Sequence, residues 1–378
     1  LSLATALLIF PSIGAASQSL VITNKNESTA SIITLSDGKT VATLPTGNAP
    51  HEVAVSRDGK WAVATDYGAA GPGGTTLTLI DVAGRRVAKT ITFGGHVRPH
   101  GAAFLPDNRT VAVTAERGGA LVMIDVVTGE VTGEEATGQM AGHMVSLSPD
   151  SKTAYLANIQ PGTLSIVDLA GDKPAVTVKV GTMTEAIATA PDGKTVWLGS
   201  NNTGKVYVVD VAKQAVIDSV QTSGFPYRIG FTPDNRTAIV TNPMSNEVWL
   251  IDAQTREKKQ RIAVEAPGGG SAGPFGLIVS PKGGTAWITM NGVAKVLKAW
   301  GWQVTTDFHG EIIVKEAIDQ SKFSFNYDTQ EYAYQEVQKL LNEAIVLLQR
   351  TDGAVDQAFL ARTDKLYGGD RSKWLKLA

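Results

Sequence analysis

The sequence predicts an all-β fold, a seven-bladed β-propeller of four-stranded antiparallel blades, followed by a small α-helical C-terminal region. The first observation behind this prediction is a sixteen-residue phrase that recurs at spacings of 49, 43, 42, 42 and 48 residues. Its six copies begin at His51, His100, His143, Glu185, Tyr227 and Phe275. A fixed period in this range is typical of repeat architectures, in which each unit buries its apolar face against its neighbours. The second observation is that apolar residues alternate within each copy, as they do in strands.

The two halves of the phrase are predicted to be strands joined by a tight turn. In one copy Trp61, Val63 and Thr65 fall on one face, and Ala62 and Ala64 fall on the other. This is the period of a β-strand. The intervening PDNR, PDSK and PDGK segments combine the fixed φ of Pro, the local hydrogen bond of Asp, and a Gly or Asn that tolerates positive φ. Such segments are typical of hairpin turns.

A third and a fourth strand complete each repeat. The third apolar run ends in an aspartate in five repeats, at Asp81, Asp125, Asp168, Asp210 and Asp252. A fourth, less regular run follows, such as AVTVKVGT from Ala175. Four short antiparallel strands in each repeat are typical of a propeller blade.

The number of blades follows from the second strand of the phrase. The segment LVITN at Leu20 matches that strand, which gives seven copies and leaves the first blade without its own innermost strand. Rings of this kind are normally closed by a strand from the C-terminal end. The segment FHGEIIVKE is one candidate for this strand, and it would place His309 at the position of His100.

The repeat resembles a known family. The segment TPDNRTAIVTN followed by VWLIDAQT is similar to the YVTN-type β-propeller repeat, over residues 19–299. The segments PHEVAVSRDGK and RPHGAAFLPDN also resemble the blade openings of seven-bladed lactonase-type propellers. The resemblance implies a secreted or periplasmic protein. It does not imply a particular reaction, because a shared fold does not carry function.

The N-terminal residues 1–18 form an apolar stretch that ends in small residues around Ala15 and Ala16. This pattern predicts a secretory signal peptide, and the mature protein is expected in the periplasm or outside the cell. A membrane anchor and a buried strand are the alternatives. The apolar core from Leu1 to Ile13 is too short to span a bilayer comfortably, so no transmembrane span is expected after signal removal.

The C-terminal residues 300–378 lose the repeat pattern. A helix is predicted over 328–350 and a second, shorter one over 354–366. The apolar face of the first helix comprises Ala333, Val337, Leu340, Leu341, Ala344, Ile345 and Leu348. The two helices would form a hairpin that packs on itself, on the propeller or on a partner. A gene fusion, or a frameshifted sequence, is the alternative explanation for the abrupt change.

Composition excludes some classes of function. The chain has no cysteine, which excludes disulfides and thiolate metal sites. Its 34 basic and 36 acidic residues are nearly balanced and form no basic patch, so a nucleic-acid partner is not expected. The expected partner is a small molecule or a protein at the propeller face. The glycine-rich stretch GAAGPGG from Gly68 lacks the Lys-Ser/Thr of a phosphate loop and predicts a flexible loop.

The candidate site comes from the first position of the phrase. Innermost strands line the channel of a propeller, so equivalent positions should surround one mouth of it. Imidazole and carboxylate groups are ligands of divalent metals, which predicts a metal site formed by His51, His100, His143 and Glu185. A wider ligand-binding set adds His96, Arg98, Tyr227 and Arg228. The alternative is structural, with each histidine side chain bonded to a carbonyl of the neighbouring blade.

Three functions remain open from the sequence. The first is a secreted or periplasmic binding or scaffold protein with a ligand or metal site at the channel mouth. The second is a lactonase-like hydrolase, in which neutral histidines would act as general bases near pH 7. The third is a protein that docks a partner through its helical tail. No catalytic residue is assigned, and whether the protein is an enzyme stays open.

Overall fold

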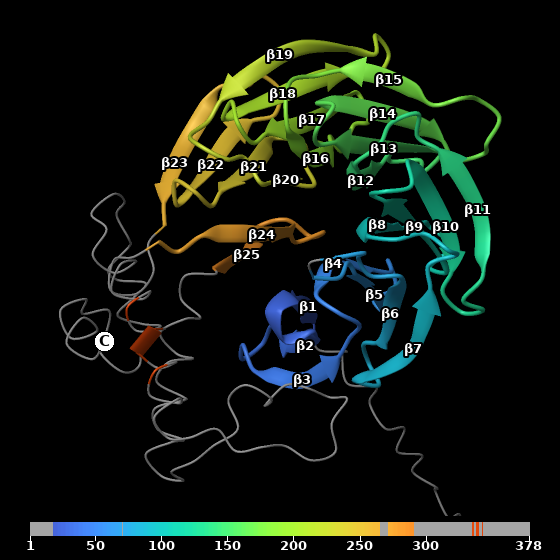
Figure 1. Ribbon diagram of the computed structural model, residues 1–378. Helices are drawn as coiled ribbons and strands as arrows, with labels where there is room; N and C mark the ends of the chain where they lie inside the picture. Colours follow the sequence, from blue (N-terminus) through green and yellow to red (C-terminus); the bar gives the residue numbers. More distant parts are fainter. Residues whose placement is uncertain are drawn as a thin grey trace, which may run out of the picture. The chain divides into compact units, whose positions relative to one another are not determined.

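The computed structural model describes residues 18–69, 71–264 and 271–290, and the single residues Gln335, Gln338, Lys339 and Asn342. Apart from these four helical residues and a single-turn 3₁₀ helix, η1 (Lys25–Glu27), the described elements are antiparallel strands (Figure 1). Five of their seven sheets have four strands. The all-β prediction is therefore confirmed for the described residues, while the number of blades stays a prediction.

The chain divides into two compact units. Unit 1 comprises Leu1–Val111 and Asp125–Glu130, and unit 2 comprises Ala112–Ile124 and Val131–Ala378. Unit 1 contains two complete sheets. The strands of the first are β1 (Ser19–Asn24), β2 (Thr29–Thr34) and β3 (Thr40–Pro45). Those of the second are β4 (Pro50–Val55), β5 (Trp61–Asp66), β6 (Thr76–Asp81) and β7 (Arg86–Thr92).

The chain passes between the two units within the next sheet. Its strands are β8 (Pro99–Phe104), β9 (Thr110–Ala115), β10 (Ala120–Asp125) and β11 (Val131–Ala136).

Unit 2 continues with three four-stranded sheets and one pair of strands. The first sheet contains β12 (Gly142–Leu147), β13 (Thr153–Asn158), β14 (Thr163–Asp168) and β15 (Val176–Lys179). The second contains β16 (Thr184–Thr189), β17 (Thr195–Ser200), β18 (Lys205–Asp210) and β19 (Ala215–Gln221). The third contains β20 (Arg228–Phe231), β21 (Thr237–Asn242), β22 (Glu247–Asp252) and β23 (Lys258–Ala263). The pair is β24 (Pro274–Val279) and β25 (Ala286–Met290).

The turns form as their sequences predict. Between β12 and β13, Asp150 accepts hydrogen bonds from the Ser148 hydroxyl at 2.6 Å and from the Lys152 amide at 3.1 Å. The aspartates that end the third strand act in the same way. Asp125 accepts hydrogen bonds from the amides of Val127 and Thr128, at 2.8 and 3.0 Å, and so holds the hairpin that leads to the fourth strand.

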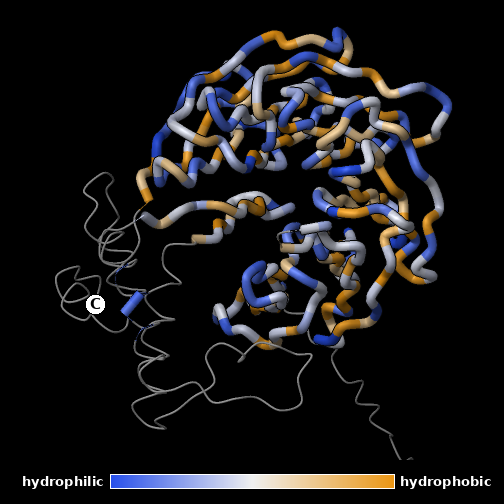
Figure 2. Tube along the Cα trace, in the orientation of Figure 1, coloured by the Kyte–Doolittle hydropathy of each residue, from blue (hydrophilic) through white to orange (hydrophobic). Residues whose placement is uncertain are grey.

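The core of unit 2 lies between successive sheets. Trp197 of β17 is fully buried, and its ring meets Phe231 edge-on, with ring centroids 5.3 Å apart. By contrast, six of the seven residues of the outer strand β19 are exposed. Along the strands, hydrophobic and hydrophilic residues alternate in short segments (Figure 2). In inner strands such as β5 and β17, consecutive residues are buried, so the sheets are covered on both faces, while the outer strand β19 stays exposed.

Several predicted segments lie outside the described residues. They are residues 1–17 of the signal peptide, the closing segment at His309 and, except for the four helical residues above, both C-terminal helices. The first sheet has three strands, as expected for a repeat without its own innermost strand. Among the residues that the structure describes, no helix is long and apolar enough to cross a membrane.

Candidate functional site

In unit 1, His51, Glu52 and His100 form a compact group. His51 and Glu52 are the second and third residues of β4, and His100 is the second residue of β8. The two imidazole rings have centroids 4.3 Å apart, and His51 Nδ1 lies 3.2 Å from Glu52 Oε1. One ligand atom from each of the three residues lies within 4.8 Å of the others. His100 is fully buried, whereas 17% of the His51 side chain and 19% of the Glu52 side chain are exposed. The group can therefore be reached from solvent.

A β-bulge brings the neighbouring residues His51 and Glu52 to the same place. The register between β4 and β5 runs from Pro50↔Asp66 directly to Val53↔Ala64, so β4 has one more residue than its partner here. A bulge re-aims side chains that would otherwise point to opposite faces. The Glu52 amide donates a hydrogen bond of 3.1 Å to the Thr65 hydroxyl, which holds the bulge.

The same register shift recurs at the candidate positions of unit 2. It lies between Gly142 and Met144 in β12, between Thr184 and Ile187 in β16, and between Pro274 and Leu277 in β24. The shifted residues include His143, Glu185 and Phe275. The repeat therefore encodes a bulge at the start of these innermost strands, and the candidate residues sit on it.

A threonine of the preceding sheet anchors several of these bulges. The hydroxyl of Thr23 donates to the His51 carbonyl at 3.0 Å, that of Thr114 to the His143 carbonyl at 2.7 Å, and that of Thr241 to the Phe275 carbonyl at 3.1 Å. These bonds use the backbone carbonyls of His51 and His143. The structural alternative, in which the histidine side chains bond carbonyls of the neighbouring blade, stays a prediction.

Tyr67 packs against the group in unit 1. Its ring meets those of His51 and His100 edge-on, with centroids 5.4 and 5.2 Å away. Two cations lie near the same ring, with Lys25 Nζ at 5.0 Å and Arg98 Cζ at 4.7 Å from its centroid. Of the predicted residues in this unit, Arg98 therefore joins the group. His96 instead lies against Phe93, with ring centroids 5.6 Å apart.

The glycine-rich segment after Tyr67 packs against these residues. The Arg98 amide donates to the Gly74 carbonyl at 2.8 Å. A Cβ atom on Gly73 would lie 2.4 Å from Arg98 Cγ, and one on Gly74 would lie 1.6 Å from the Asp66 carbonyl oxygen. Glycine is therefore required at both positions because the backbone approaches its neighbours closely.

Asp66, at the end of β5, is a buried carboxylate beside this segment. Its oxygens accept hydrogen bonds from the Gly47 amide at 3.0 Å and from the hydroxyls of Thr76 and Thr78 at 2.8 and 2.9 Å. Burial raises the pKa of Asp66 to about 6, although these hydrogen bonds oppose the change.

In unit 2, a second group surrounds Glu185. His143 Nε2 lies 3.5 Å and Arg228 Nη1 lies 3.8 Å from Glu185 Oε1, and the Asn201 amide donates to Oε2. All three charged or titratable side chains are largely buried. Burial alone raises the pKa of the Glu185 carboxyl group, but the contacts with His143, Arg228 and Asn201 lower it below its ordinary value. Glu185 is therefore ionised at neutral pH.

Aromatic residues border this second group. The Arg228 guanidinium lies over the Tyr227 ring, with Cζ 4.0 Å from its centroid. Phe275 meets Tyr227 edge-on with centroids 5.0 Å apart, and Phe225 stacks on it at 5.8 Å. Tyr227, Phe225 and Phe275 are half-buried.

The predicted site residues thus fall into two groups. His51, Arg98 and His100 meet in unit 1, and His143, Glu185, Tyr227 and Arg228 meet in unit 2. A single metal site made of His51, His100, His143 and Glu185 stays a prediction. Sequence reasoning missed Glu52, Lys25, Tyr67 and Asn201. Lys25, Tyr67 and Asn201 each come directly after the second strand of their repeats. Aligning the repeats at this position would have identified them.

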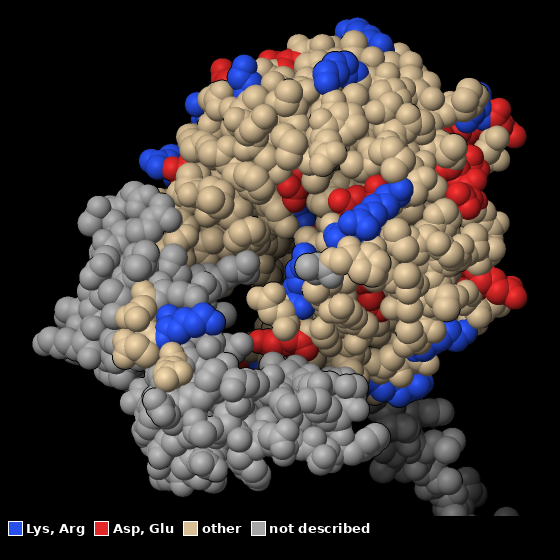
Figure 3. Space-filling view, in the orientation of Figure 1, with Lys and Arg blue, Asp and Glu red and all other residues tan. Residues whose placement is uncertain are grey.

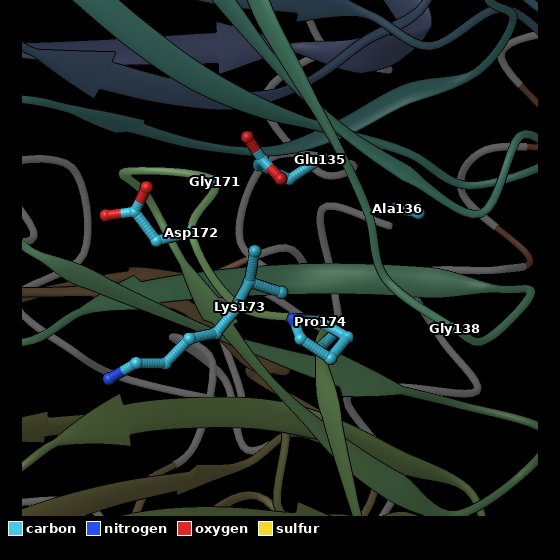
Figure 4. A pocket seen from close by; sticks show the side chains of 9 residues that line it. Glu135, Ala136, Gly138, Gly171, Asp172, Lys173 and Pro174 are labelled. Atoms are coloured by element: carbon cyan, nitrogen blue, oxygen red, sulfur yellow. The ribbon is translucent and has the colours of Figure 1, made fainter.

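A separate cleft of about 400 Å³ lies on the outer part of unit 2 (Figure 4). Glu135 and Ala136 of β11 line one side of it, and residues 171–175, before β15, line another. None of its lining residues belongs to the two groups. On the face seen in Figure 3, basic and acidic side chains are interspersed over the described surface.

Comparisons with known proteins give the family of the chain. Residues 71–309 match the family described as "Cytochrome D1 heme domain", and residues 282–378 match "Starch-binding associating with outer membrane". Hydrazine synthase from Kuenenia stuttgartiensis has a similar structure, with a TM-score of 0.62 and 17% identity over 71% of this chain and 88% of that one. This likeness supports the β-propeller fold. No curated protein matches the chain. Because the first match spans more than half of the sequence, the chain belongs to the cytochrome D1 heme domain family.

Proposed function

We propose that the protein is an extracytoplasmic β-propeller that binds one divalent metal ion through His51, Glu52 and His100. The observation that carries the proposal is that ligand atoms of these three residues lie within 4.8 Å of one another. The apolar N-terminal stretch and the outer-membrane association named for the family matched by residues 282–378 support a location outside the cytoplasm.

The ligand set suits a transition metal. Two imidazoles and one carboxylate bind Zn²⁺, Ni²⁺, Cu²⁺ or Fe²⁺ at distances of about 2.0 to 2.2 Å. The bulge holds the backbone of His51 and Glu52, and burial holds His100, before a metal arrives, so binding would cost little conformational entropy. A set of three protein ligands also leaves one coordination position for water or a ligand.

The family name raises the question of a heme, and neither the His51–His100 pair nor the cleft beside β11 fits one. Two axial imidazoles on one heme iron would have ring centroids about 6 Å apart, since each iron–nitrogen bond is about 2 Å long. Here the centroids are 4.3 Å apart, and Tyr67 packs on both rings. A heme on His100 alone would need the space that His51 and Tyr67 fill. The cleft beside β11 contains no His, Tyr, Met or Cys to bind iron.

The experiment is metal binding to the full-length protein after chelator treatment. Isothermal titration with Zn²⁺ and Ni²⁺ should give about one site per chain. At a metal concentration of 100 times Kd, the free energy of unfolding should rise by about 2.7 kcal/mol. His100→Ala and Glu52→Gln should remove or weaken both effects.

His96→Ala is the matched control, because His96 lies in the same unit and packs on Phe93 but is not one of the three proposed ligands. It should bind metal like the wild type. The proposal would be contradicted if His96→Ala lost as much metal affinity as His100→Ala. It would also be contradicted if metal still stabilised the His100→Ala variant. The lactonase-like hydrolase stays a prediction, favoured by the open coordination position.

A further inference from the structure

The group around Glu185 is built on the same repeat position as the group in unit 1, but its chemistry differs. His143 and Glu185 occupy the bulged positions of β12 and β16, as His51 does in β4. Beside them stands Arg228, whose guanidinium is 3.8 Å from Glu185 and largely buried. A fixed positive charge at this distance opposes a second metal ion. This group is therefore suited to another kind of ligand.

Its charges also select against ions in general. The negative charge of Glu185 and the positive charge of Arg228 offset each other inside a poorly solvated site. An anion would be attracted by Arg228 but repelled by Glu185, and a cation the reverse, so an ion gains no net attraction that offsets the cost of its own desolvation. A neutral ligand meets neither repulsion.

The hydrogen-bonding groups call for a ligand that both donates and accepts. Arg228 can only donate, Glu185 can only accept, and His143 and Asn201 can do either. The contacts of Glu185 with His143 and Arg228, at 3.5 and 3.8 Å, are longer than the 2.7 to 2.9 Å typical of charge-assisted hydrogen bonds. Among the described residues, the buried Oδ1 atom of Asn201 accepts no hydrogen bond. A donor from a ligand would satisfy it.

The neighbouring aromatic rings supply the apolar side of the site. Tyr227, half-buried between Arg228 and Phe275, presents a ring next to the polar cluster. Small-molecule sites commonly combine such aromatic walls with a few placed polar groups. A ligand with hydroxyl groups on one side and a C–H face on the other matches both parts.

We propose that the group His143–Glu185–Asn201–Arg228, with Tyr227, binds a neutral polyhydroxylated ligand, that is, a sugar. Its hydroxyl groups bind Glu185, Asn201 and Arg228, and its C–H face contacts the part of the Tyr227 ring that Arg228 and Phe225 leave uncovered. This site is independent of the metal site proposed for unit 1.

The test is isothermal titration of the full-length protein with glucose, mannose and maltotriose, with sodium benzoate and benzamidine as charged probes. At least one sugar should bind saturably, and the charged probes should not bind. Tyr227→Ala and Asn201→Ala should each weaken sugar binding about tenfold or more, because each removes a direct contact. Asn202→Ala is the matched control, since Asn202 bonds Thr182 instead of Glu185 and should leave affinity unchanged.

Three results would overturn the proposal. The first is the absence of saturable binding by any of the sugars. The second is sugar binding that survives both variants, which would assign the ligand to another part of the chain, such as the region matching the starch-binding family. The third is preferential binding of benzoate or benzamidine that is lost in the variants. Thermal unfolding of each variant must match the wild type for its titration to count. Because metal binding to unit 1 is measured separately, failure of one proposal leaves the other standing.

Discussion

At the scale of single residues, Asp66 shows how burial changes chemistry beside the candidate metal site. The carboxylate is almost fully buried, and its pKa is raised to about 6. Its hydrogen bonds tie together the segment before β4, through Gly47, and the first half of β6, through Thr78. The protonation state of Asp66 therefore affects the hydrogen bonds next to the loop that carries Tyr67.

The first prediction concerns stability against pH. The Asp66 carboxyl group holds its proton more tightly in the folded protein, with a pKa of about 6, than at its ordinary value of 3.8. Stability from this group is therefore present below pH 4 and is lost between pH 4 and 6, by about 2 to 3 kcal/mol. Asp66→Asn, which stays neutral, should abolish this slope and stabilise the protein at pH 7. Urea denaturation at pH 4.5 and pH 7 measures the difference.

Asp210→Asn serves as the control for this prediction. A backbone hydrogen bond from Lys213 lowers the pKa of that half-buried carboxyl group, so replacing it should leave the slope between pH 4 and 6 in place. The free energy of unfolding could change between pH 4.5 and pH 7 by the same amount in the wild type and in Asp66→Asn. In that case Asp66 would not be the source of the pH dependence.

At the scale of elements, the recurring β-bulge connects the repeat to its sites. Period-2 alternation predicted the strands, and turn residues predicted the hairpins, because both signals are local. The bulge leaves no such signal, since it depends on pairing with the next strand. Sequence reasoning therefore placed His51 and His100 correctly at equivalent strand starts but could not see that Glu52 reaches the same point.

The second prediction tests the bulge anchor. Thr23→Val removes the hydroxyl that holds the His51 carbonyl, with little change in shape, and should cost about 1 kcal/mol of stability. It should also weaken metal binding, because His51 and Glu52 lose their fixed position. Calorimetry measures the affinity, and chemical denaturation measures the stability.

Thr241→Val is an equivalent change in unit 2, where the hydroxyl holds the Phe275 carbonyl. It should cost a similar amount of stability and leave metal affinity unchanged. If both variants lowered metal affinity equally, the effect would be a general loss of stability and would not arise from the bulge at His51.

At the scale of the whole molecule, the repeat period and the four strands of each repeat predicted a propeller, and the family match agrees with it. The period could not predict how the predicted site residues group. Six equivalent positions imply one ring of side chains, but neighbouring residues differ from repeat to repeat. Arg228 occupies in its repeat the place that Glu52 holds in another, and the two groups therefore carry opposite charges at that position.

The last prediction follows from the unequal sheets. Strands such as β5, β13 and β17 pair with a neighbour on both sides, whereas β1 and β25 each pair on one side among the described strands. Local opening needs less free energy where fewer hydrogen bonds and buried contacts must break. Native-state hydrogen exchange should therefore protect the amides of β13 and β17 most strongly, and those of β1 and β25 should exchange through smaller openings. Equal protection in all sheets would instead mean that β1 and β25 are held as firmly as the four-stranded sheets. The chain would then unfold as one cooperative unit, despite its repeats.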